Sequence, residues 1–439
     1  MKHCWFPLGV AIATAILQQQ LLLNKPPRLI KIEPISAGRE SAAIRMRFSR
    51  SMDGSSLRKE VKIMPKTAYQ LLGKGNSWSL YIKTKQPITA SFKLEVGGKD
   101  RRGLGLKSEL WLWDPRPILV AARPVVGGDQ IQSWSRNKWQ PLSPVRGKVL
   151  AMLPLGNGAG IASVINAKPM ASEVWSLMLS NQAKPLLENQ LNKHPLIFAA
   201  LSTDQQGDLL VQFSTPTQPG SKVDLWRMID LQLHQPARLG LEATGPIQLV
   251  PQGHQVVIPE FDGLSLQNLP PLAPKREVLP GSRDLSSFCP QPGRAILVRH
   301  WPDYRRSVEL LEPGKTPKQL WLGQEAVLAT ACAGGGERVW VLLLSGIKAP
   351  LLELLEINKQ AKVARKVLLR DLELDPGSKL HYDVSRQKLL LLLRPKTNNY
   401  QQPLPAQIHL INLENYAIEV IPGSATHAGW LPSRQLKKI

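Results

Sequence analysis

The stretch that most constrains this fold is residues 378–429, which carries one complete unit of short β-strands. Four segments have the length and composition of strands and are separated by polar turns: residues 379–383, 389–393, 407–413 and 417–421. The second segment is a run of leucines, too apolar for a half-exposed strand, so we expect it to be buried on both faces. Four antiparallel strands in about 45 residues is typical of one blade of a β-propeller.

The same unit recurs upstream from residue 118. Its second and most apolar strand begins, in successive units, at Ile118, Gly160, Leu209, Gln255, Ala295, Arg338 and Lys388. The spacing of about 40 to 50 residues is in the range of four-stranded blades. The pattern predicts an all-β protein with a propeller of seven blades over residues 118–439. The unit at Gln255 is the weakest, which leaves six or eight blades open.

The first unit, residues 118–142, lacks an innermost strand, while residues 425–432 at the other end of the chain have no unit after them. We therefore expect the C-terminal strand to complete the first blade, because ring closure removes sheet edges that would pair with other chains. In its turn positions the repeat resembles the WD40-like propellers of exported bacterial proteins of the TolB type. Its turns depart from the Pro-Asp-Gly of that family, as in Pro290-Gln291-Pro292-Gly293, so the resemblance implies architecture and no ligand.

Residues 24–117 have a different pattern. Ile44, Met46 and Phe48 alternate with Arg45 and Arg47, the period of a strand with one buried face. Further alternating segments predict a small β-sandwich, and they span residues 61–65, 78–83, 91–96 and 110–113.

The phrase Phe48-Ser49-Arg50-Ser51-Met52-Asp53, a strand ending at Pro65 and a late turn from Asp100 to Gly103 resemble the bacterial Ig-like domain of the SbsA type. The match covers about residues 30–115. Members of that family are non-catalytic modules of exported and cell-surface proteins. The resemblance therefore implies a location and an architecture but no reaction.

Residues 1–23 resemble an export signal. Lys2 and His3 precede an apolar run over residues 4–17, which is shorter than the ~20 residues that a membrane-spanning helix needs. The sequence predicts an exported protein, periplasmic or on the cell surface. Whether this segment is cleaved or retained as an N-terminal anchor stays open.

The net charge is +23, and residues 24–117 carry 20 Lys and Arg against 8 Asp and Glu. Such a basic domain predicts an anionic neighbour, either membrane headgroups or an acidic envelope polymer. The candidate contacts are Arg45, Arg47, Lys83, Lys85, Lys99, Arg101 and Arg102. The alternative is a solvated basic surface without a fixed partner. Nucleic acid is disfavoured, because export removes the usual partner and no basic helix is visible.

The candidate innermost strands carry a single acidic residue, Asp383. Glycoside hydrolysis usually needs two carboxylates about 5–10 Å apart, so a propeller glycosidase is disfavoured. The other titratable groups there are Cys289, Cys332, His381 and His427. A zinc ion would require such ligands to converge to about 2.0–2.3 Å, which the walls of a channel oppose, so we expect neither metal nor cofactor.

Cys289 and Cys332 lie 43 residues apart, at the same offset in consecutive units. An oxidising compartment permits a bridge. However, innermost strands of neighbouring blades usually diverge beyond the Cα separation of about 7 Å that a disulfide spans. The sequence therefore favours two free thiols.

These observations predict a monomeric, non-enzymatic protein of the cell envelope that binds or scaffolds an envelope protein, an anionic polymer or a membrane surface. The alternative is a hydrolase or lyase that acts on an extracytoplasmic polymer at the propeller face.

Overall fold

The computed structural model describes residues 18, 24–38, 40–84, 86–168, 171–346, 350–396 and 404–439. The predicted export segment lies outside the described residues, except for Gln18, and so does the candidate contact Lys85. Within the described ranges, no helix has both the length and the apolar character to cross a membrane.

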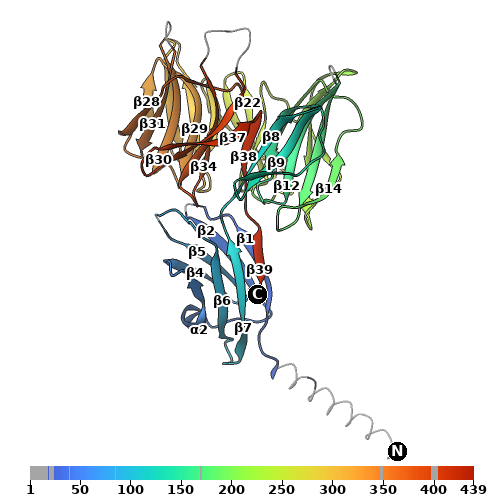
Figure 1. Cartoon of the computed structure of the whole chain (residues 1–439), viewed down its shortest axis with the longest axis vertical. Helices are drawn as coiled ribbons and strands as arrows, with labels where there is room; N and C mark the ends of the chain where they lie inside the picture. The colour runs from blue at the N-terminus through green and yellow to red at the C-terminus, as the bar shows by residue number, and fades with distance from the viewer. Residues whose placement is uncertain are drawn as a thin grey trace, which may run out of the picture.

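The N-terminal part of the chain forms two antiparallel sheets that enclose one apolar core (Figure 1). The first sheet consists, in spatial order, of β1 (Leu29–Ile35), β2 (Ala42–Phe48), β5 (Ser77–Ile82) and β4 (Tyr69–Lys74). The second sheet consists of β3 (Lys62–Met64), β6 (Phe92–Lys99), β7 (Gly105–Asp114) and β39 (Gln435–Lys438). A short helix, α2 (Gly54–Glu60), lies between β2 and β3 in the chain.

The alternation seen in the sequence of β2 sets the core of this domain. Ile44, Met46 and Phe48 are fully buried, while Arg45 and Arg47 between them are exposed. After β2, the carboxylate of Asp53 accepts hydrogen bonds from the backbone N–H groups of Ser55 and Ser56 and begins α2. The sequence did not predict this helix, because seven residues are too short to show a helical period.

The last strand of the chain belongs to this N-terminal domain. β39 pairs with β7 from Gln435 opposite Asp114 to Lys438 opposite Trp111, and Leu436 packs against the core. The sequence had assigned all of residues 118–439 to the propeller, and this pairing corrects that boundary. The physical reason is the free edge of β7, whose backbone groups gain partners from the end of the chain.

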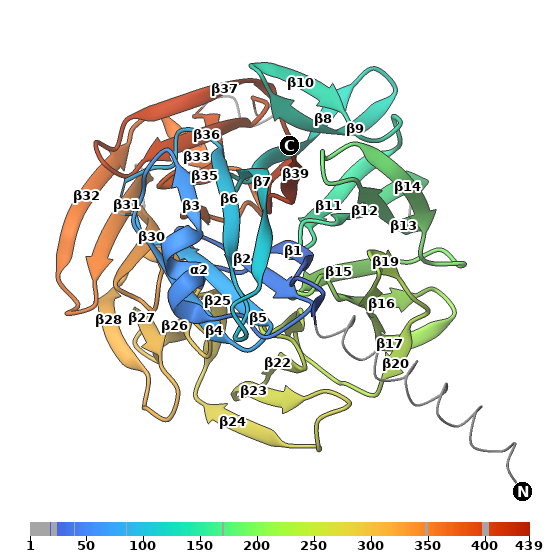
Figure 2. The same ribbon diagram turned by 90° about the horizontal axis from the view of Figure 1, so that it is seen from below.

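The described parts of residues 118–431 form seven antiparallel sheets of four or five strands around a ring, which is the arrangement of a β-propeller (Figure 2). From the inside outward, the first sheet consists of β38 (His427–Leu431), β8 (Ile118–Val125), β9 (Gly128–Ser135) and β10 (Lys138–Pro141). The second consists of β11 (Lys148–Pro154), β12 (Gly160–Lys168), β13 (Ala171–Leu179) and β14 (Pro185–Gln190). The third consists of β15 (Phe198–Thr203), β16 (Leu209–Thr215), β17 (Gln218–Trp226) and β20 (Ala237–Leu239). A small hairpin of β18 (Met228–Ile229) and β19 (Gln232–Leu233) follows β17.

The fourth sheet consists of β21 (Gln248–Leu249), β22 (Gln255–Glu260), β23 (Gly263–Asn268) and β24 (Arg276–Pro280). The fifth consists of β25 (Arg283–Phe288), β26 (Ala295–His300), β27 (Arg306–Leu311) and β28 (Lys318–Gly323). The sixth consists of β29 (Ala326–Ala333), β30 (Arg338–Ser345), β31 (Leu351–Asn358) and β32 (Val363–Leu369). The seventh contains β33 (Leu372–Leu374), β34 (His381–Asp383), β35 (Lys388–Pro395), β36 (Gln407–Asn412) and β37 (Ile418–Ser424).

The leucine run forms the centre of β35 and is buried on both faces, as the sequence predicted. Leu389, Leu391 and Leu393 pack in the same cluster as Trp340 of the preceding sheet. The other two leucines of the run pack in the cluster that contains Leu119 of the first sheet. A propeller blade has neighbours on both sides, so its central strands need apolar residues at every position.

β38 is the innermost strand of the first sheet, where it pairs with β8 from His427 opposite Ala122 to Leu431 opposite Ile118. Side chains of the first sheet also bind the end of the seventh. Arg123 Nε donates to the carbonyl of Ser424 at 3.1 Å, and Trp139 Nε1 donates to the carbonyl of Pro422 at 2.8 Å.

The chain crosses between the two parts twice, once between β7 and β8 and once between β38 and β39. The crossings are tied together, because Ser433 Oγ donates to the carbonyl of Asp114. A third link joins loops, where the backbone N–H of Ile88 donates to the carbonyl of Ser385 at 2.7 Å. Seen from below, the N-terminal sheets lie over one mouth of the ring (Figure 2).

Candidate functional site

A cavity of about 2130 Å³ extends from the interior of the ring to the N-terminal domain. Its wall includes residues of β25 and β29, residues 372–385 of the seventh sheet, and residues of β1 and β7. The candidate channel residues Cys332, His381 and Asp383 all line it.

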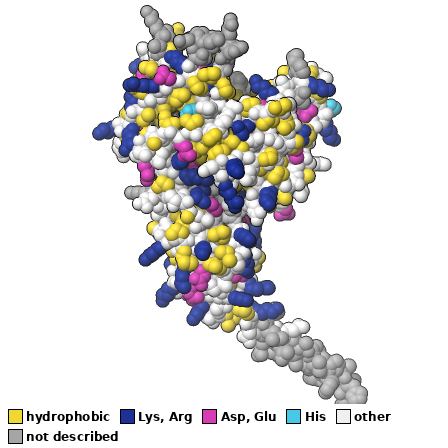
Figure 3. Space-filling view, in the orientation of Figure 1, with side chains coloured by type: hydrophobic (Ala, Val, Ile, Leu, Met, Phe, Trp, Pro, Cys, Tyr) yellow, Lys and Arg dark blue, Asp and Glu magenta, His cyan; other side chains and the backbone are white. Residues whose placement is uncertain are grey.

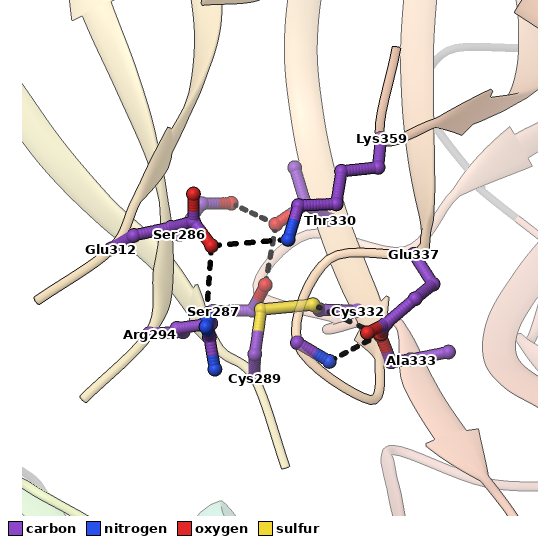
Figure 4. The surroundings of a disulfide bond; sticks show 11 residues. Ser286, Ser287, Cys289, Arg294, Glu312, Thr330, Cys332, Ala333, Glu337 and Lys359 are labelled. Carbon is purple, nitrogen blue, oxygen red and sulfur yellow. Dashed lines mark hydrogen bonds and ion pairs between the residues drawn. A yellow bond between two sulfur atoms is a disulfide. The ribbon is translucent and has the colours of Figure 1, made fainter. Parts of the chain in front are cut away.

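Cys289 and Cys332 form a disulfide, with Cα atoms 5.0 Å apart (Figure 4). This corrects the expectation of two free thiols. The innermost strands β25 and β29 lie close together at this height, since Thr330 Oγ1 donates to Ser286 Oγ at 2.9 Å and lies 2.7 Å from Ser287 Oγ. Neighbouring blades therefore do not diverge here as the sequence reasoning assumed.

Both strands are irregular just before their cysteine. β25 changes register between Leu285 and Ser287, and β29 changes register between Val327 and Ala329. A bulge bends a strand and increases its twist. These two bends accompany the close approach that the regular spacing of blades did not predict.

The same two sheets are joined at their periphery by a buried carboxylate (Figure 4). Glu312 accepts hydrogen bonds from Lys359 Nζ at 3.1 Å, from Arg294 Nε at 3.1 Å and from Lys315 Nζ at 3.3 Å. These bonds, with that of Lys359 first, lower the pKa of Glu312 to about 2. The carboxylate is therefore ionised across the physiological range and holds the two sheets together.

The cysteines are bonded to each other, so they do not present thiolates to a metal ion. In the part of the chain that the structure describes, no group of three or more His, Cys, Asp or Glu side chains is placed to hold one.

Asp383 shapes a turn. Its Oδ1 accepts from Ser385 N at 2.8 Å, from Ser385 Oγ at 2.7 Å and from Arg386 N at 3.3 Å. Burial raises the pKa of Asp383, and the hydrogen bonds from Ser385 oppose that effect. The turn that it fixes presents the Ser385 carbonyl to Ile88, so Asp383 supports the contact between the ring and the N-terminal domain.

The two histidines of the candidate set are both neutralised by burial. His381 lies in the cavity wall, where burial first and the charge of Lys379 second lower its pKa to about 4. His427 lies at the start of β38, and burial likewise lowers its pKa. Neither ring can therefore carry a charge to a ligand at neutral pH.

The cations predicted for one basic face lie in three places. Arg45 lines the cavity, and Arg47 lies on the same outward-facing side of β2 as Arg45. Lys83 follows β5 at the end nearest the ring, beside the start of β2. Lys99, Arg101 and Arg102 lie at the opposite end, in the hairpin between β6 and β7.

That far end gathers further cations that the sequence reasoning missed. Backbone hydrogen bonds join its four segments: Ser49 N to Arg28 O, Met52 N to Gly75 O, Asp53 N to Lys99 O and Arg101 N to Ser51 O. We call the resulting group the basic pole, which consists of Lys25, Arg28, Lys74, Lys99, Arg101 and Arg102. All six side chains are exposed. The glycines on either side of Lys74, in Gly73-Lys74-Gly75, indicate a turn, and this signal could have added Lys74 to the predicted contacts.

Few carboxylates balance the basic pole. Asp100 is buried and accepts from Arg102 Nη2 at 3.1 Å, and Asp53 is the N-cap of α2. Among the described residues, the other five cations of the pole have no acidic partner. Figure 3 shows Lys and Arg side chains on both flanks of this end of the domain. The described N-terminal domain also begins here, at Asn24.

The chain matches no protein-family model and no curated protein. Among solved structures, TolB from Acinetobacter baumannii is 10% identical, with 86% of this chain and 82% of that chain covered at a TM-score of 0.40. The β-propeller domain of the Trilobed protease from Pyrococcus furiosus is 10% identical, with 82% and 99% covered at a TM-score of 0.47. Prolyl oligopeptidase B from Galerina marginata is 11% identical, with 84% and 51% covered at a TM-score of 0.47. No function is carried over at this level of similarity.

Proposed function

We propose that this protein is a non-enzymatic component of the cell envelope that docks through its basic pole on anionic lipid headgroups. The observation that carries the proposal is the gathering of six exposed cations at the end of the domain where the predicted export segment joins. A membrane that held this segment would face the pole. Each Lys or Arg near an anionic surface contributes about 1 kcal/mol, within a Debye length of about 8–10 Å.

The domain assignment supports this arrangement. We assign residues 24–117, completed by β39, to an Ig-like module of the SbsA type, and the seven sheets of the ring to seven blades. The paired sheets around one core and the Phe48-Ser49-Arg50-Ser51-Met52-Asp53 phrase support the first assignment. In this arrangement the Ig-like module is a spacer, and the propeller is presented to partners in the periplasm or at the cell surface.

The test is co-sedimentation of residues 24–439 with phosphatidylcholine vesicles, with and without phosphatidylglycerol, over a salt series. The test variant is Lys74→Gln/Lys99→Gln/Arg101→Gln. The matched control, Lys184→Gln/Lys193→Gln/Lys362→Gln, removes the same charge from exposed positions of the ring. We expect binding to the anionic vesicles only, weakened about 100-fold in the test variant and nearly unchanged in the control.

Equal binding to both vesicle types, or equal losses in the two variants, would contradict docking through the pole. Added polyglutamate separates lipid from polymer. If it displaces the protein from vesicles at a low concentration, the partner is an acidic polymer.

A further inference from the structure

In the seventh sheet the innermost strand, predicted over residues 379–383, is β34 at His381–Asp383, and a separate segment, β33 at Leu372–Leu374, precedes it on the same side of β35. β33 pairs with the end of β35, at Leu393 to Pro395, and β34 pairs with its start, at Lys388 to Leu390. Between them, residues 375–378 form a β-turn in which Ser378 N donates to Asp375 O at 3.0 Å. Pro376 is its second residue and Gly377, at φ 80°, its third, which is the signature of a type II turn.

This turn lines the cavity, and both backbone groups of Leu392 keep a partner at the break between β33 and β34. Residues 372–385 all line the cavity, and a Cβ added at Gly377 would meet no atom within 4 Å. At the break, Asp375 N donates to Leu392 O at 3.1 Å and Ser378 Oγ accepts from Leu392 N at 3.1 Å. The effect of the break is to place the next residue, Lys379, in the wall of the cavity.

Lys379 is an uncompensated cation. Its side chain is accessible from the cavity, and the surrounding walls lower the pKa of its ammonium by desolvation. Among the described residues it has no hydrogen-bonded or ion-paired partner. His381, on the same wall, is neutral and supplies no second charge.

Of the described carboxylates that line the same cavity, Glu33 pairs with Lys31, Asp230 lies in the hairpin of β18 and β19, and the other four are engaged as follows. Arg394 Nε lies 3.2 Å from the carboxylate of Glu373, and Arg394 Nη1 lies 3.9 Å from that of Asp375. His300 Nε2 lies 2.8 Å from the carboxylate of Asp284, and Ser385 Oγ donates to the carboxylate of Asp383 at 2.7 Å. Within the described ranges Lys379 has no such partner, and its side chain is exposed to the cavity. A ligand that brings a negative charge into the cavity would pair with its ammonium.

We propose that the cavity binds a small organic anion whose carboxylate or phosphate group pairs with the ammonium of Lys379. The cavity is larger than the ~300–1,000 Å³ of common ligand pockets, so the ligand occupies only the part around the turn. This site is independent of the docking proposed above.

The test uses the full chain, with inorganic phosphate and citrate as probes at constant ionic strength. Thermal shift reports binding, and reductive ¹³C-methylation of lysines gives an NMR signal for each ammonium. Lys379→Arg removes the Lys379 signal and keeps the charge, which assigns the signal. Lys379→Gln removes the charge, and Lys362→Gln is the control at an exposed lysine of the turn between β31 and β32.

We expect at least one probe to raise the Tm of the wild type, Lys379→Arg and Lys362→Gln, but not of Lys379→Gln. The same probe should move the Lys379 signal and raise its titration midpoint by about 1 pH unit, a tenfold preference for the charged amine. A response to phosphate alone assigns a phosphate ester, and a response to citrate alone assigns a carboxylate. An equal Tm rise in Lys379→Gln, or an unmoved Lys379 signal with both probes, would overturn the site.

Discussion

Cys289 and Cys332 bridge two neighbouring innermost strands of the ring, with Cα atoms 5.0 Å apart. The same two sheets share the hydroxyl contact between Ser287 and Thr330 and, nearer the rim, the ionic contacts of Glu312. Opening the ring between these sheets therefore requires the rupture of a covalent bond as well as polar contacts.

Replacement of both cysteines by serine should destabilise the protein by about 3–4 kcal/mol, because a bridge across 43 residues restricts the unfolded chain. Urea unfolding of the variant and the oxidised wild type measures the difference. Reduced wild type should match the variant. Peptide mapping under non-reducing conditions that returned two free thiols would refute the bridge itself.

Two truncations should separate the roles of the C-terminal strands. Deletion of residues 435–439 removes β39 and the contact of Leu436 with the N-terminal core, so calorimetry should show a lower transition for that domain alone. Deletion of residues 424–439 also removes β38 and leaves the inner edge of β8 unpaired, so the transition of the ring should fall as well. A ring transition that is equally low in both truncations would contradict this division.

Asp204 should make stability depend on pH. Burial first, and the charge of Asp208 second, raise its pKa from 3.8 to about 7. Between these values the native state binds more protons than the unfolded state, so stability falls as pH rises from about 4 to 7 and then levels off. Asp204→Asn keeps an acceptor for Gln206 N and Asp208 N, each at 2.9 Å, and removes the charge.

The Asp204→Asn variant should match the wild type near pH 4 and exceed its stability at pH 8 by on the order of 3 kcal/mol. Urea unfolding at several pH values measures this. Asp262→Asn, at an exposed turn, is the matched control and should leave the slope unchanged. A parallel pH profile for wild type and Asp204→Asn would rule out this residue as the cause.

Arg338, whose side chain is 34% exposed, pairs with the buried Glu356, and removal of one partner alone should cost more than removal of both. Glu356 accepts from Arg338 Nε at 2.7 Å and Nη2 at 3.2 Å, and also from the Tyr416 hydroxyl. Arg338→Met leaves the buried carboxylate of Glu356 without its cation and should cost about 1–3 kcal/mol. Arg338→Met/Glu356→Leu should cost much less in urea unfolding, and additive losses would argue against coupling.

Several features of this protein follow from short stretches of sequence. Alternation along residues 44–48 determines which side chains of β2 enter the core, since the side chains of a strand point to opposite faces in turn. Five adjacent leucines determine that β35 is covered on both faces. The recurrence of such strands from residue 118 onward predicts a propeller, because each unit needs a neighbour to bury its apolar faces. These signals are local, because the geometry of a strand alone determines which of its side chains share a face.

Other features depend on which segments meet in space. Cys289 and Cys332 share an offset in the repeat, but only the folded ring shows that their Cα atoms lie within reach of a bond, beside the register changes of β25 and β29. The sequence of residues 435–438 describes a strand and does not say that its partner is β7 rather than a strand of the ring. Arg28, Lys74 and Lys99 lie far apart in the chain, and backbone hydrogen bonds between their loops place them at the same end of one domain. The sequence thus determined the strands and the faces that they bury. The tertiary structure decided which edges, turns and charges face one another, because separations in space between distant segments are set by packing and not by local propensity.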